Sequence, residues 1–233
     1  MSPTLLCIHG AGFTGRVFDG QREVFSDLRA PNLPGHESPG APATIDEFAG
    51  YVEEYVRDEG LGRVVLCGHS LGGAIALQVA LRGLPQLEAL VLLGCGARLR
   101  VGAHFLDGLK DDFEETASTI ARSLYADVSS PLVAQATSSF TRVGQAQTLR
   151  DFTACNSFDV TAQLSNISAP LLAITGIHDV MTPPKYAQTL AAGVAHGSAA
   201  IIEDAGHMVM QEQPAQTNVA LLNFVTTLQS RVL

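Results

Sequence analysis

The sequence predicts an α/β protein: a mostly parallel β-sheet with helices on both faces and a helical segment inserted between two strands. Short, continuous apolar runs alternate with segments of helical periodicity along most of the chain. Such runs are typical of parallel strands, because helices bury both faces of a parallel sheet. The alternation is interrupted once, between Gly96 and about Ile167. The length of 233 residues, 46% of them hydrophobic, suits one domain with a substantial core.

Four strands and two helices are expected before the interruption. The first helix begins after Thr44, a suitable N-cap, and stops at Gly60. A glycine-rich turn follows the first strand, and the third strand runs directly into the second helix. The expected strands are 4–9, 25–31 (the weakest), 63–68 and 88–94, and the expected helices are 45–60 and 71–83.

The interruption itself predicts helices, because its apolar residues recur at intervals of three or four or their multiples. The two series are Phe105, Leu109, Phe113, Ile120 and Leu124, and then Leu132, Ala136, Phe140 and Val143. We therefore expect a helical cap over residues 96–167, inserted in a core formed by residues 1–95 and 168–233.

The chain after the interruption returns to the strand-and-helix pattern. Strands are expected at 169–175 and 198–203, followed by a helix over 214–229. This last helix reads as amphipathic, with one apolar residue to a turn along one side. These apolar residues are Val219, Leu222, Val225 and Leu228.

Composition restricts the classes of partner. The formal net charge of −9 argues against nucleic acid and anionic membranes. No stretch approaches the ~18 consecutive apolar residues of a membrane span, and the N-terminal "MSPTLLCIHG" lacks a basic leader. We expect a small-molecule substrate, with no nucleic acid and no membrane as partner. Whether the chain forms a homo-oligomer stays open.

The four cysteines indicate a reducing compartment. Cys7, Cys67, Cys95 and Cys155 show no C-x-x-C spacing, and most lie in or beside apolar strand-like runs. Buried reduced thiols are the expected state, which fits a cytoplasmic location. No cysteine or histidine lies at ligand spacing from another, so we expect no metal site.

One serine has the surroundings of a nucleophile. Ser70 lies between Gly68 and Gly72, directly after an expected strand and before an expected helix. A sharp strand-to-helix turn exposes the serine but brings strand and helix so close that the flanking positions must be small. The pattern G-x-S-x-G therefore indicates a nucleophile elbow. The alternative is a helix N-cap serine beside packing glycines.

A reactive serine needs a base and a group that orients the base. Asp179 follows the strand 169–175, and His207 lies in the loop after the strand 198–203. The order Ser70, Asp179, His207 is the order found with a nucleophile elbow. Asp204 is a rival orienting group on the same loop as the histidine. The other histidines have less context: His69 is expected to make a structural hydrogen bond, and the remainder are His9, His36, His104, His178 and His196.

Acyl transfer also needs donors for the charge that develops on the carbonyl oxygen. Two backbone N–H groups usually stabilise it. One expected donor is Leu71, the residue after the nucleophile, and the other is Ala11, in the turn that follows the first strand. His9 and Gly10 would shape this turn. The alternative is a glycine-rich turn with packing duties only.

Together these motifs resemble the α/β-hydrolase family. The matching stretches are "HGAG" at 9–12, "NLPGHESPG" at 32–40, "GHSLGG" at 68–73, "FTACNSFDV" at 152–160, "TGIHDVMTP" at 175–183 and "DAGHMVMQEQP" at 204–214. They cover nearly the whole chain in the family's order. The chain begins at the family's "HG" strand and so resembles its compact members, which include esterases and hydroxynitrile lyases. Glu37 replaces a glycine in one turn, and a serine at position 70 argues against dehalogenases and epoxide hydrolases.

The resemblance implies a carboxylesterase-like serine hydrolase that cleaves an ester through an acyl-enzyme at Ser70, without metal or organic cofactor. The cap would cover the site, and a small or medium apolar ester is the expected substrate. Candidate pocket residues are Phe13, Phe105, Leu106, Leu109, Phe113, Leu124, Phe140 and Met208. Most of those in the cap could equally form the cap's own core.

Three alternatives stay open. The same triad supports C–C bond hydrolysis, lactone hydrolysis, cyanohydrin cleavage by a hydroxynitrile lyase, or peracid formation by a cofactor-free haloperoxidase or perhydrolase. The fold also serves non-enzymatic small-molecule receptors. A scaffolding protein with a vestigial site is the third alternative.

Overall fold

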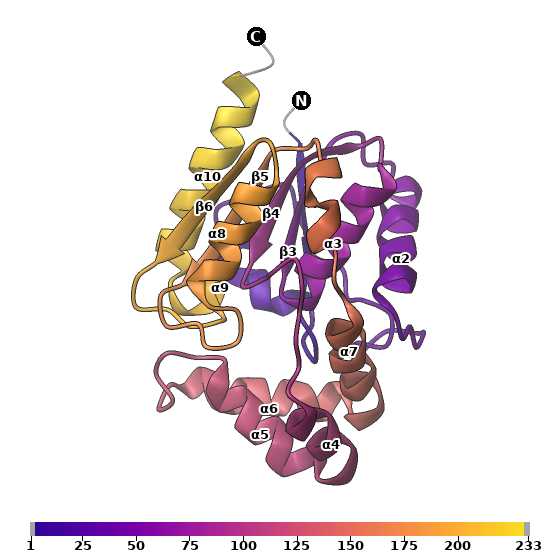
Figure 1. Cartoon of the computed structure of the whole chain (residues 1–233), viewed down its shortest axis with the longest axis vertical. Helices are drawn as coiled ribbons and strands as arrows, with labels where there is room; N and C mark the ends of the chain where they lie inside the picture. The colour runs from indigo at the N-terminus through magenta and orange to yellow at the C-terminus, as the bar shows by residue number, and fades with distance from the viewer. Residues whose placement is uncertain (1–2, 231–233) are drawn as a thin grey trace.

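The computed structural model describes residues 3–230, which build a parallel six-stranded sheet between two layers of helices (Figure 1). The strand order is β2-β1-β3-β4-β5-β6, and every neighbouring pair is parallel. The predicted fold class is confirmed, and the sheet is parallel throughout. The strands are β1 (Thr4–Ile8), β2 (Leu28–Arg29), β3 (Val64–His69), β4 (Leu87–Leu93), β5 (Leu171–Gly176) and β6 (Gly197–Ile202).

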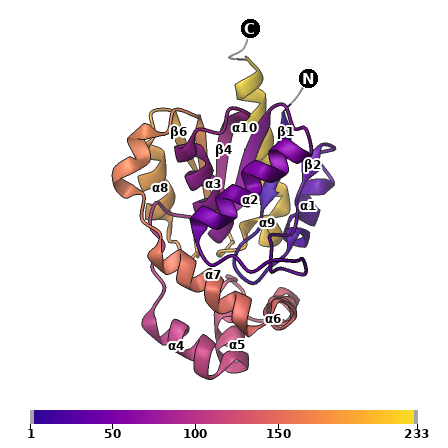
Figure 2. The same cartoon turned by 90° about the vertical axis from the view of Figure 1, so that its right-hand side faces the viewer.

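Helices cover both faces of the sheet, as Figure 2 shows. One face is covered by α2 (Ile45–Asp58), α3 (Leu71–Arg82) and α8 (Pro184–Gly193), and the other by α1 (Asp19–Arg22), α9 (Val209–Glu212) and α10 (Pro214–Ser230). A short 3-10 helix, Gly15–Phe18, precedes α1. Within residues 3–230, no helix combines the length and apolarity that crossing a membrane requires.

Local chemistry explains where α2 begins. The Thr44 hydroxyl accepts a hydrogen bond from the Glu47 N–H at 3.2 Å, and the Glu47 carboxylate accepts one from the Thr44 N–H at 3.0 Å. This reciprocal pair is a capping box, which satisfies two amides that a helix N-terminus leaves free. The predicted N-cap is confirmed.

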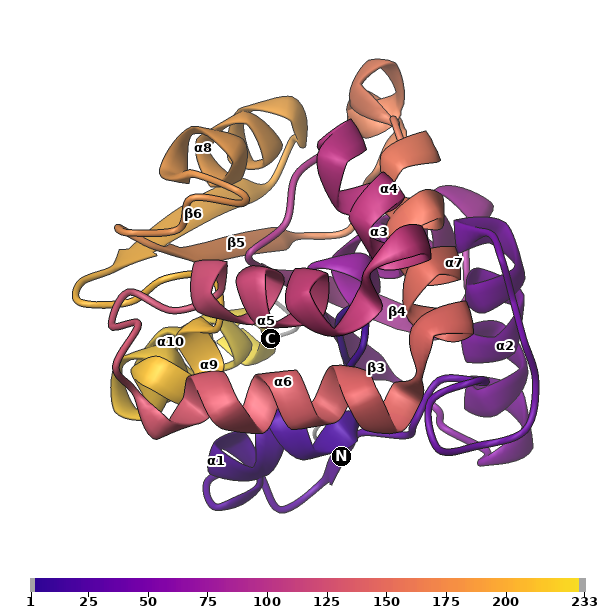
Figure 3. The same ribbon diagram turned by 90° about the horizontal axis from the view of Figure 1, so that it is seen from below.

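Four helices between β4 and β5 form a separate layer beyond the carboxyl ends of the strands (Figures 1 and 3). We call them the cap. They are α4 (Ala103–Asp111), α5 (Phe113–Ser123), α6 (Pro131–Val143) and α7 (Gln145–Ser157). A 3-10 helix over Thr161–Asn166 belongs to the expected insertion but packs against α8 of the core. The cap helices themselves therefore span 103–157.

Two details differ from the sequence-based expectation. The weak strand at 25–31 is reduced to Leu28–Arg29. In α10 the predicted apolar side is wrong for Val219 and Leu222, which are 58% and 41% exposed while Leu221 is fully buried; Leu228 of the predicted series is buried. Polar side chains settle the orientation of this helix: Thr217 donates a hydrogen bond to the Val209 carbonyl and Asn218 to the Gly20 carbonyl, both at 3.0 Å.

Candidate active site

Ser70 occupies a strained turn between β3 and α3. Its φ of 50° and ψ of −112° lie in a region that non-glycine residues rarely adopt. The Ser70 N–H donates a hydrogen bond to the Leu93 carbonyl of β4 at 2.9 Å, which anchors the turn to the neighbouring strand. A Cβ at Gly68 would overlap the Gly72 carbonyl, and one at Gly72 would overlap the Ile8 carbonyl. The two glycines are thus required by the close approach of strand and helix.

Asp179 and His207 form a buried pair at the same end of the sheet. The His207 Nδ1 atom lies 2.9 Å from Asp179 Oδ2. The carboxylate also accepts hydrogen bonds from the N–H groups of Met181 and Thr182 at 2.8 Å and from the Thr182 hydroxyl at 2.7 Å. Burial raises the pKa of Asp179, but His207 and these hydrogen bonds more than offset it, so the pKa lies well below its usual value. Asp179 therefore stays ionised.

The backbone of His207 is held from two sides. Its N–H donates to the Leu124 carbonyl at the end of α5 at 2.8 Å, and its carbonyl accepts from His69 Nε2 at 3.2 Å. Burial, and then the proximity of His207, holds the pKa of His69 well below its usual value. His69 is therefore neutral and makes the structural hydrogen bond expected of it.

Ser70 and His207 line one cavity. Among the hydrogen bonds of residues 3–230, none joins the Ser70 hydroxyl to the His207 ring. Such bonds are often long without substrate and shorten only in the reacting complex. The arrangement therefore brings the two candidate groups, the Ser70 hydroxyl and the His207 ring, to one cavity.

The rival orienting residue lies elsewhere. Asp204 is exposed and adopts a positive φ of 53°. Its backbone carbonyl accepts a hydrogen bond from Gln213, and no hydrogen bond in the described chain links its carboxylate to His207. Asp179 is the carboxylate in contact with the imidazole.

The turn after β1 lies beside the elbow. Leu71 is the first residue of α3, where helix geometry leaves an N–H without an intrahelical partner. No hydrogen bond within residues 3–230 uses the N–H of Ala11. His9 Nε2 accepts from the Leu33 N–H at 2.9 Å, so Nδ1 carries the proton and donates to the Gly10 carbonyl. Burial, followed by repulsion from His36, lowers the pKa of His9 to about 3, so this histidine is neutral.

The cavity separates the candidate pocket residues into two groups. Phe13, Leu124 and Phe140 line it. Leu109 and Met208 are fully buried without lining it, and Phe105, Leu106 and Phe113 are half-buried away from it. The cavity is only about 60 Å³, far below the roughly 300 Å³ at the lower end of ligand pockets.

Several other lining residues were not found from the sequence. Thr182 contacts both members of the Asp179–His207 pair, and its position three residues after the acid in a turn was an available signal. Arg100 and Tyr186 also line the cavity, and no sequence pattern marked them. Arg100 is the one permanently charged residue among those lining it.

The cysteines are not rival nucleophiles. All four are buried free thiols, as predicted. Cys155 lines the cavity, but burial, followed by repulsion from Asp151, raises its pKa well above the usual value. Burial likewise raises the pKa of Cys95 to about 12. Since the thiolate is the reactive form, these thiols are inert. Residues 3–230 contain no cluster of three His, Cys, Asp or Glu that could hold a metal.

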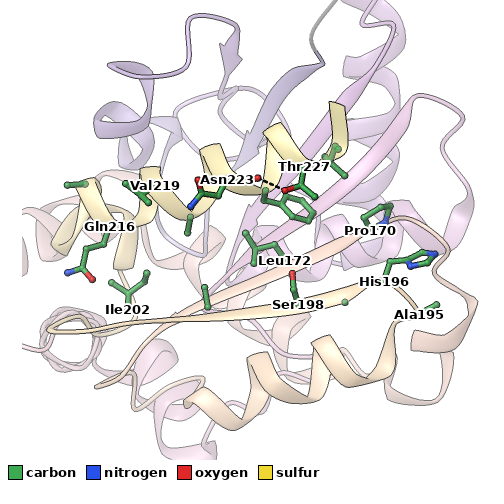
Figure 4. Close-up of a pocket in the computed structure, with 16 residues that line it drawn as sticks. Pro170, Leu172, Ala195, His196, Ser198, Ile202, Gln216, Val219, Asn223 and Thr227 are labelled. Carbon is green, nitrogen blue, oxygen red and sulfur yellow. Dashed lines mark hydrogen bonds between the residues drawn. The ribbon is translucent and has the colours of Figure 1, made fainter. Parts of the chain in front are cut away.

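A wider hollow of about 970 Å³ lies between α10 and the strands β5 and β6 (Figure 4). Its lining runs along the sheet from Pro170 and Ser198, near the amino ends of these strands, to Ile202 at the carboxyl end of β6. The exposed Val219 of α10 also faces it. His196 is its one titratable lining residue, and the hydroxyl of Ser198 donates a hydrogen bond to the Leu171 carbonyl at 3.2 Å.

A parallel sheet with a strained serine after one strand, a carboxylate after a later one and a histidine after the last is the arrangement of the nucleophile-elbow hydrolases. The chain belongs to the alpha/beta hydrolase family, whose model matches residues 5–220. The predicted family is thereby confirmed.

Named relatives are similar over most of the chain. A pimeloyl-[acyl-carrier protein] methyl ester esterase of Nitrosomonas europaea is 27% identical over 238 residues, covering 92% of each chain. Lipase LipV of Mycobacterium tuberculosis is 34% identical over 140 residues, 55% of this chain and 54% of the lipase.

Solved structures share the fold. A thermophilic esterase superposes with a TM-score of 0.88 at 29% identity and covers 97% of this chain and 90% of its own. The enol-lactonase of Burkholderia xenovorans LB400 has a TM-score of 0.86, covers 97% of this chain and 92% of its own, and is 21% identical, a likeness of fold alone.

Proposed function

We propose that the protein hydrolyses small or medium apolar esters through an acyl-enzyme at Ser70, with His207 as general base and Asp179 as its orienting group. The chain is a hydrolase acting on ester bonds, in line with its family and the esterases among its relatives. The observation that carries the finer proposal is the buried Asp179–His207 pair in one cavity with the strained Ser70.

Each group has a step in the reaction. Ser70 Oγ attacks the ester carbonyl while His207 Nε2 takes its proton and then gives it to the leaving alcohol. Asp179 keeps the proton of the neutral ring on Nδ1, which leaves Nε2 free to accept. A water molecule, deprotonated by His207, then attacks the acyl-enzyme. His207 returns the proton to Ser70 Oγ as the acid leaves, which restores the free enzyme.

The oxyanion hole in this proposal consists of the N–H groups of Ala11 and Leu71. Both belong to turns at the carboxyl ends of adjacent strands, β1 and β3. Two fixed donors stabilise the charge of the tetrahedral intermediate, and removal of one such donor typically costs ~3 kcal/mol. No metal or organic cofactor takes part in these steps.

The substrate class follows from the lining. Phe13, Leu124, Phe140 and Phe152 make most of the wall apolar, which favours an apolar acyl or alcohol group. Two relatives are named for the methyl ester of a pimeloyl group on acyl-carrier protein; the bond is an ester, as in the proposed class, whereas the carrier makes that substrate larger. We propose a small-molecule ester as the partner, no nucleic acid or membrane, and a cytoplasmic location, and we leave open whether the chain forms a homo-oligomer.

Substitution of the nucleophile tests the proposal. Ser70→Ala is expected to abolish hydrolysis of p-nitrophenyl acetate and butyrate and labelling by a fluorophosphonate, with circular dichroism unchanged. Ser157→Ala, at an exposed cap serine, is the matched control. Labelling that persists in Ser70→Ala would show that another residue is the nucleophile. A panel of lactones, β-diketones and cyanohydrins separates ester hydrolysis from the alternative chemistries, and tight binding without turnover would indicate a receptor.

A further inference from the structure

A buried polar cluster that the catalytic steps do not use lies where the cap meets the core. Asp151 of α7 and His36 of the loop after β2 are both fully buried, with His36 Nε2 2.7 Å from Asp151 Oδ2. Gln147, one turn earlier in α7, donates to Asp151 Oδ1 at 2.9 Å. Burial of a carboxylate is costly unless hydrogen bonds and an opposite charge offset the loss of water. We therefore ask what the cluster holds in place.

The same carboxylate reaches the turn proposed as half of the oxyanion hole. The Gly12 N–H donates to Asp151 Oδ2 at 3.1 Å, and the Gly12 carbonyl accepts from the Ser139 hydroxyl of α6 at 2.9 Å. Both peptide groups of Gly12 are thereby held by the cap. Gly12 directly follows Ala11. Its φ of +72° favours glycine, and a Cβ at this position would also overlap the ring of Phe140.

We propose that Asp151 is a positioning residue: from the cap, with His36, it fixes the Gly12 peptide so that the Ala11 N–H points at the developing oxyanion. The proposal rests on the proposed function, because it presumes an oxyanion at that turn. It makes the cap part of the catalytic apparatus as well as a cover. Asp151 touches no reacting atom and acts through the turn alone.

The chemistry of the cluster calls for a carboxylate. Three donors converge on Asp151: the ring N–H of His36, the side-chain amide of Gln147 and the backbone N–H of Gly12. An asparagine would present two donor hydrogens of its own, so at least one of these contacts would become donor against donor. Since preorganised donors contribute most of the stabilisation of an oxyanion, a small displacement of the turn appears in kcat.

Two substitutions and a matched control test the proposal. In Asp151→Ala we expect kcat for p-nitrophenyl butyrate to fall about 10²-fold with KM within about threefold, as for the loss of one oxyanion donor. Asp151→Asn preserves the volume of the side chain, and its kcat should fall about tenfold. This variant therefore provides the test if the alanine variant does not fold. Gln145→Ala removes bonds to the Leu109 and Lys110 carbonyls inside the cap and should keep kcat.

A transition-state analogue separates positioning from general damage. Ser70 Oγ adds to the carbonyl of an alkyl trifluoromethyl ketone, the proton passes to His207, and the resulting alkoxide occupies the oxyanion hole. Its inhibition constant should rise in proportion to the loss in kcat/KM. Binding of the matched alcohol, which forms no adduct, should stay unchanged.

Several results would overturn the proposal. Unchanged kcat in both Asp151 variants would do so, as would a loss that the ketone does not share or an equal loss in Gln145→Ala. Each of these leaves the proposed function intact, provided that fluorophosphonate labels Ser70 in the wild type. Failure of that labelling would instead overturn the proposed function.

Discussion

The core and the cap meet at the candidate site, and each supplies something different. The core carries Ser70, Asp179 and His207 in turns at the carboxyl ends of β3, β5 and β6. The cap supplies contacts that hold the core's loops, through the Leu124 carbonyl on the His207 N–H and through Asp151 on the Gly12 N–H. The positions of the three candidate residues thus depend on short-range turn geometry, whereas the loops around them are also held by hydrogen bonds from the cap.

A second bridge strengthens this comparison at the loop of His207. The Glu212 carboxylate accepts hydrogen bonds from the Ala126 N–H, just beyond α5, at 2.7 Å and from the Gly206 N–H at 2.8 Å. Burial raises the pKa of Glu212, although the two amides oppose the shift. The Glu212 carboxylate therefore links the cap to the loop of His207, as the Asp151 carboxylate links the cap to the turn of Ala11 and Gly12.

The core side is tested most severely by Asp179→Asn. We expect kcat to fall about 10⁴-fold, because an amide stabilises the wrong tautomer of the imidazole and cannot balance its positive charge. Hydrolysis of p-nitrophenyl butyrate measures the effect. Asp204→Asn is the control and should stay near wild type. A reversed result would make Asp204 the orienting residue and move this role from the loop after β5 to the loop that carries His207.

The cap side is tested by Phe140→Ala. Phe140 is fully buried and packs on Phe13, which follows the turn of Ala11 and Gly12, with ring centroids 5.4 Å apart. The free energy of unfolding should fall by about 3–5 kcal/mol in urea denaturation. Phe105→Ala, at a half-buried cap residue away from the cavity, should cost about 1 kcal/mol. An equal loss in the free energy of unfolding in the two variants would show that Phe140 contributes no more to the packing of cap on core than Phe105 does.

Lowering the pH should reduce the free energy of unfolding through His9, which lies beside the turn after β1. Because the pKa of His9 is lowered from 6.5 to about 3, the unfolded chain takes up a proton between these values and the folded chain does not. Stability therefore falls as pH is lowered, by about 3 kcal/mol between pH 7 and pH 4 from this residue. Asp179 acts in the same direction at lower pH, since its pKa is also lowered.

Urea unfolding at pH 7 and pH 4 measures this effect. His9→Gln keeps an acceptor for the Leu33 N–H and removes the titrating ring. The difference in unfolding free energy between the two pH values should shrink by about 3 kcal/mol in this variant. The same pH dependence in both proteins would show that His9 is protonated in the folded state.

The smallest effect is expected from Glu212→Gln. The amide offers one acceptor oxygen where the carboxylate offers two, so one of the two bridging hydrogen bonds is lost. The free energy of unfolding should fall by about 1 kcal/mol, with a few-fold loss in kcat as the His207 loop loosens. A loss in stability with kcat untouched would limit this bridge to a structural role.

The cap shows where sequence reasoning ends. Helical periodicity predicted helices across the insertion, but it identifies a buried face without saying what covers that face. Leu109 belongs to the cap's own interior, whereas Phe140 and Leu124 reach the cavity. In α10 the hydrogen bonds of Thr217 and Asn218 override the apolar pattern and leave Val219 exposed.

Local patterns in the chain predicted the mostly parallel sheet, the elbow at Ser70 and the order of the candidate groups, because apolar runs, glycines and turn residues act over a few positions. The contact of His207 with Asp179, and not with Asp204, comes from the packing of distant segments. The same packing brings Asp151 to Gly12 across 139 positions of the chain. Such contacts depend on how packed elements are oriented relative to one another, and no local pattern of residues encodes that orientation.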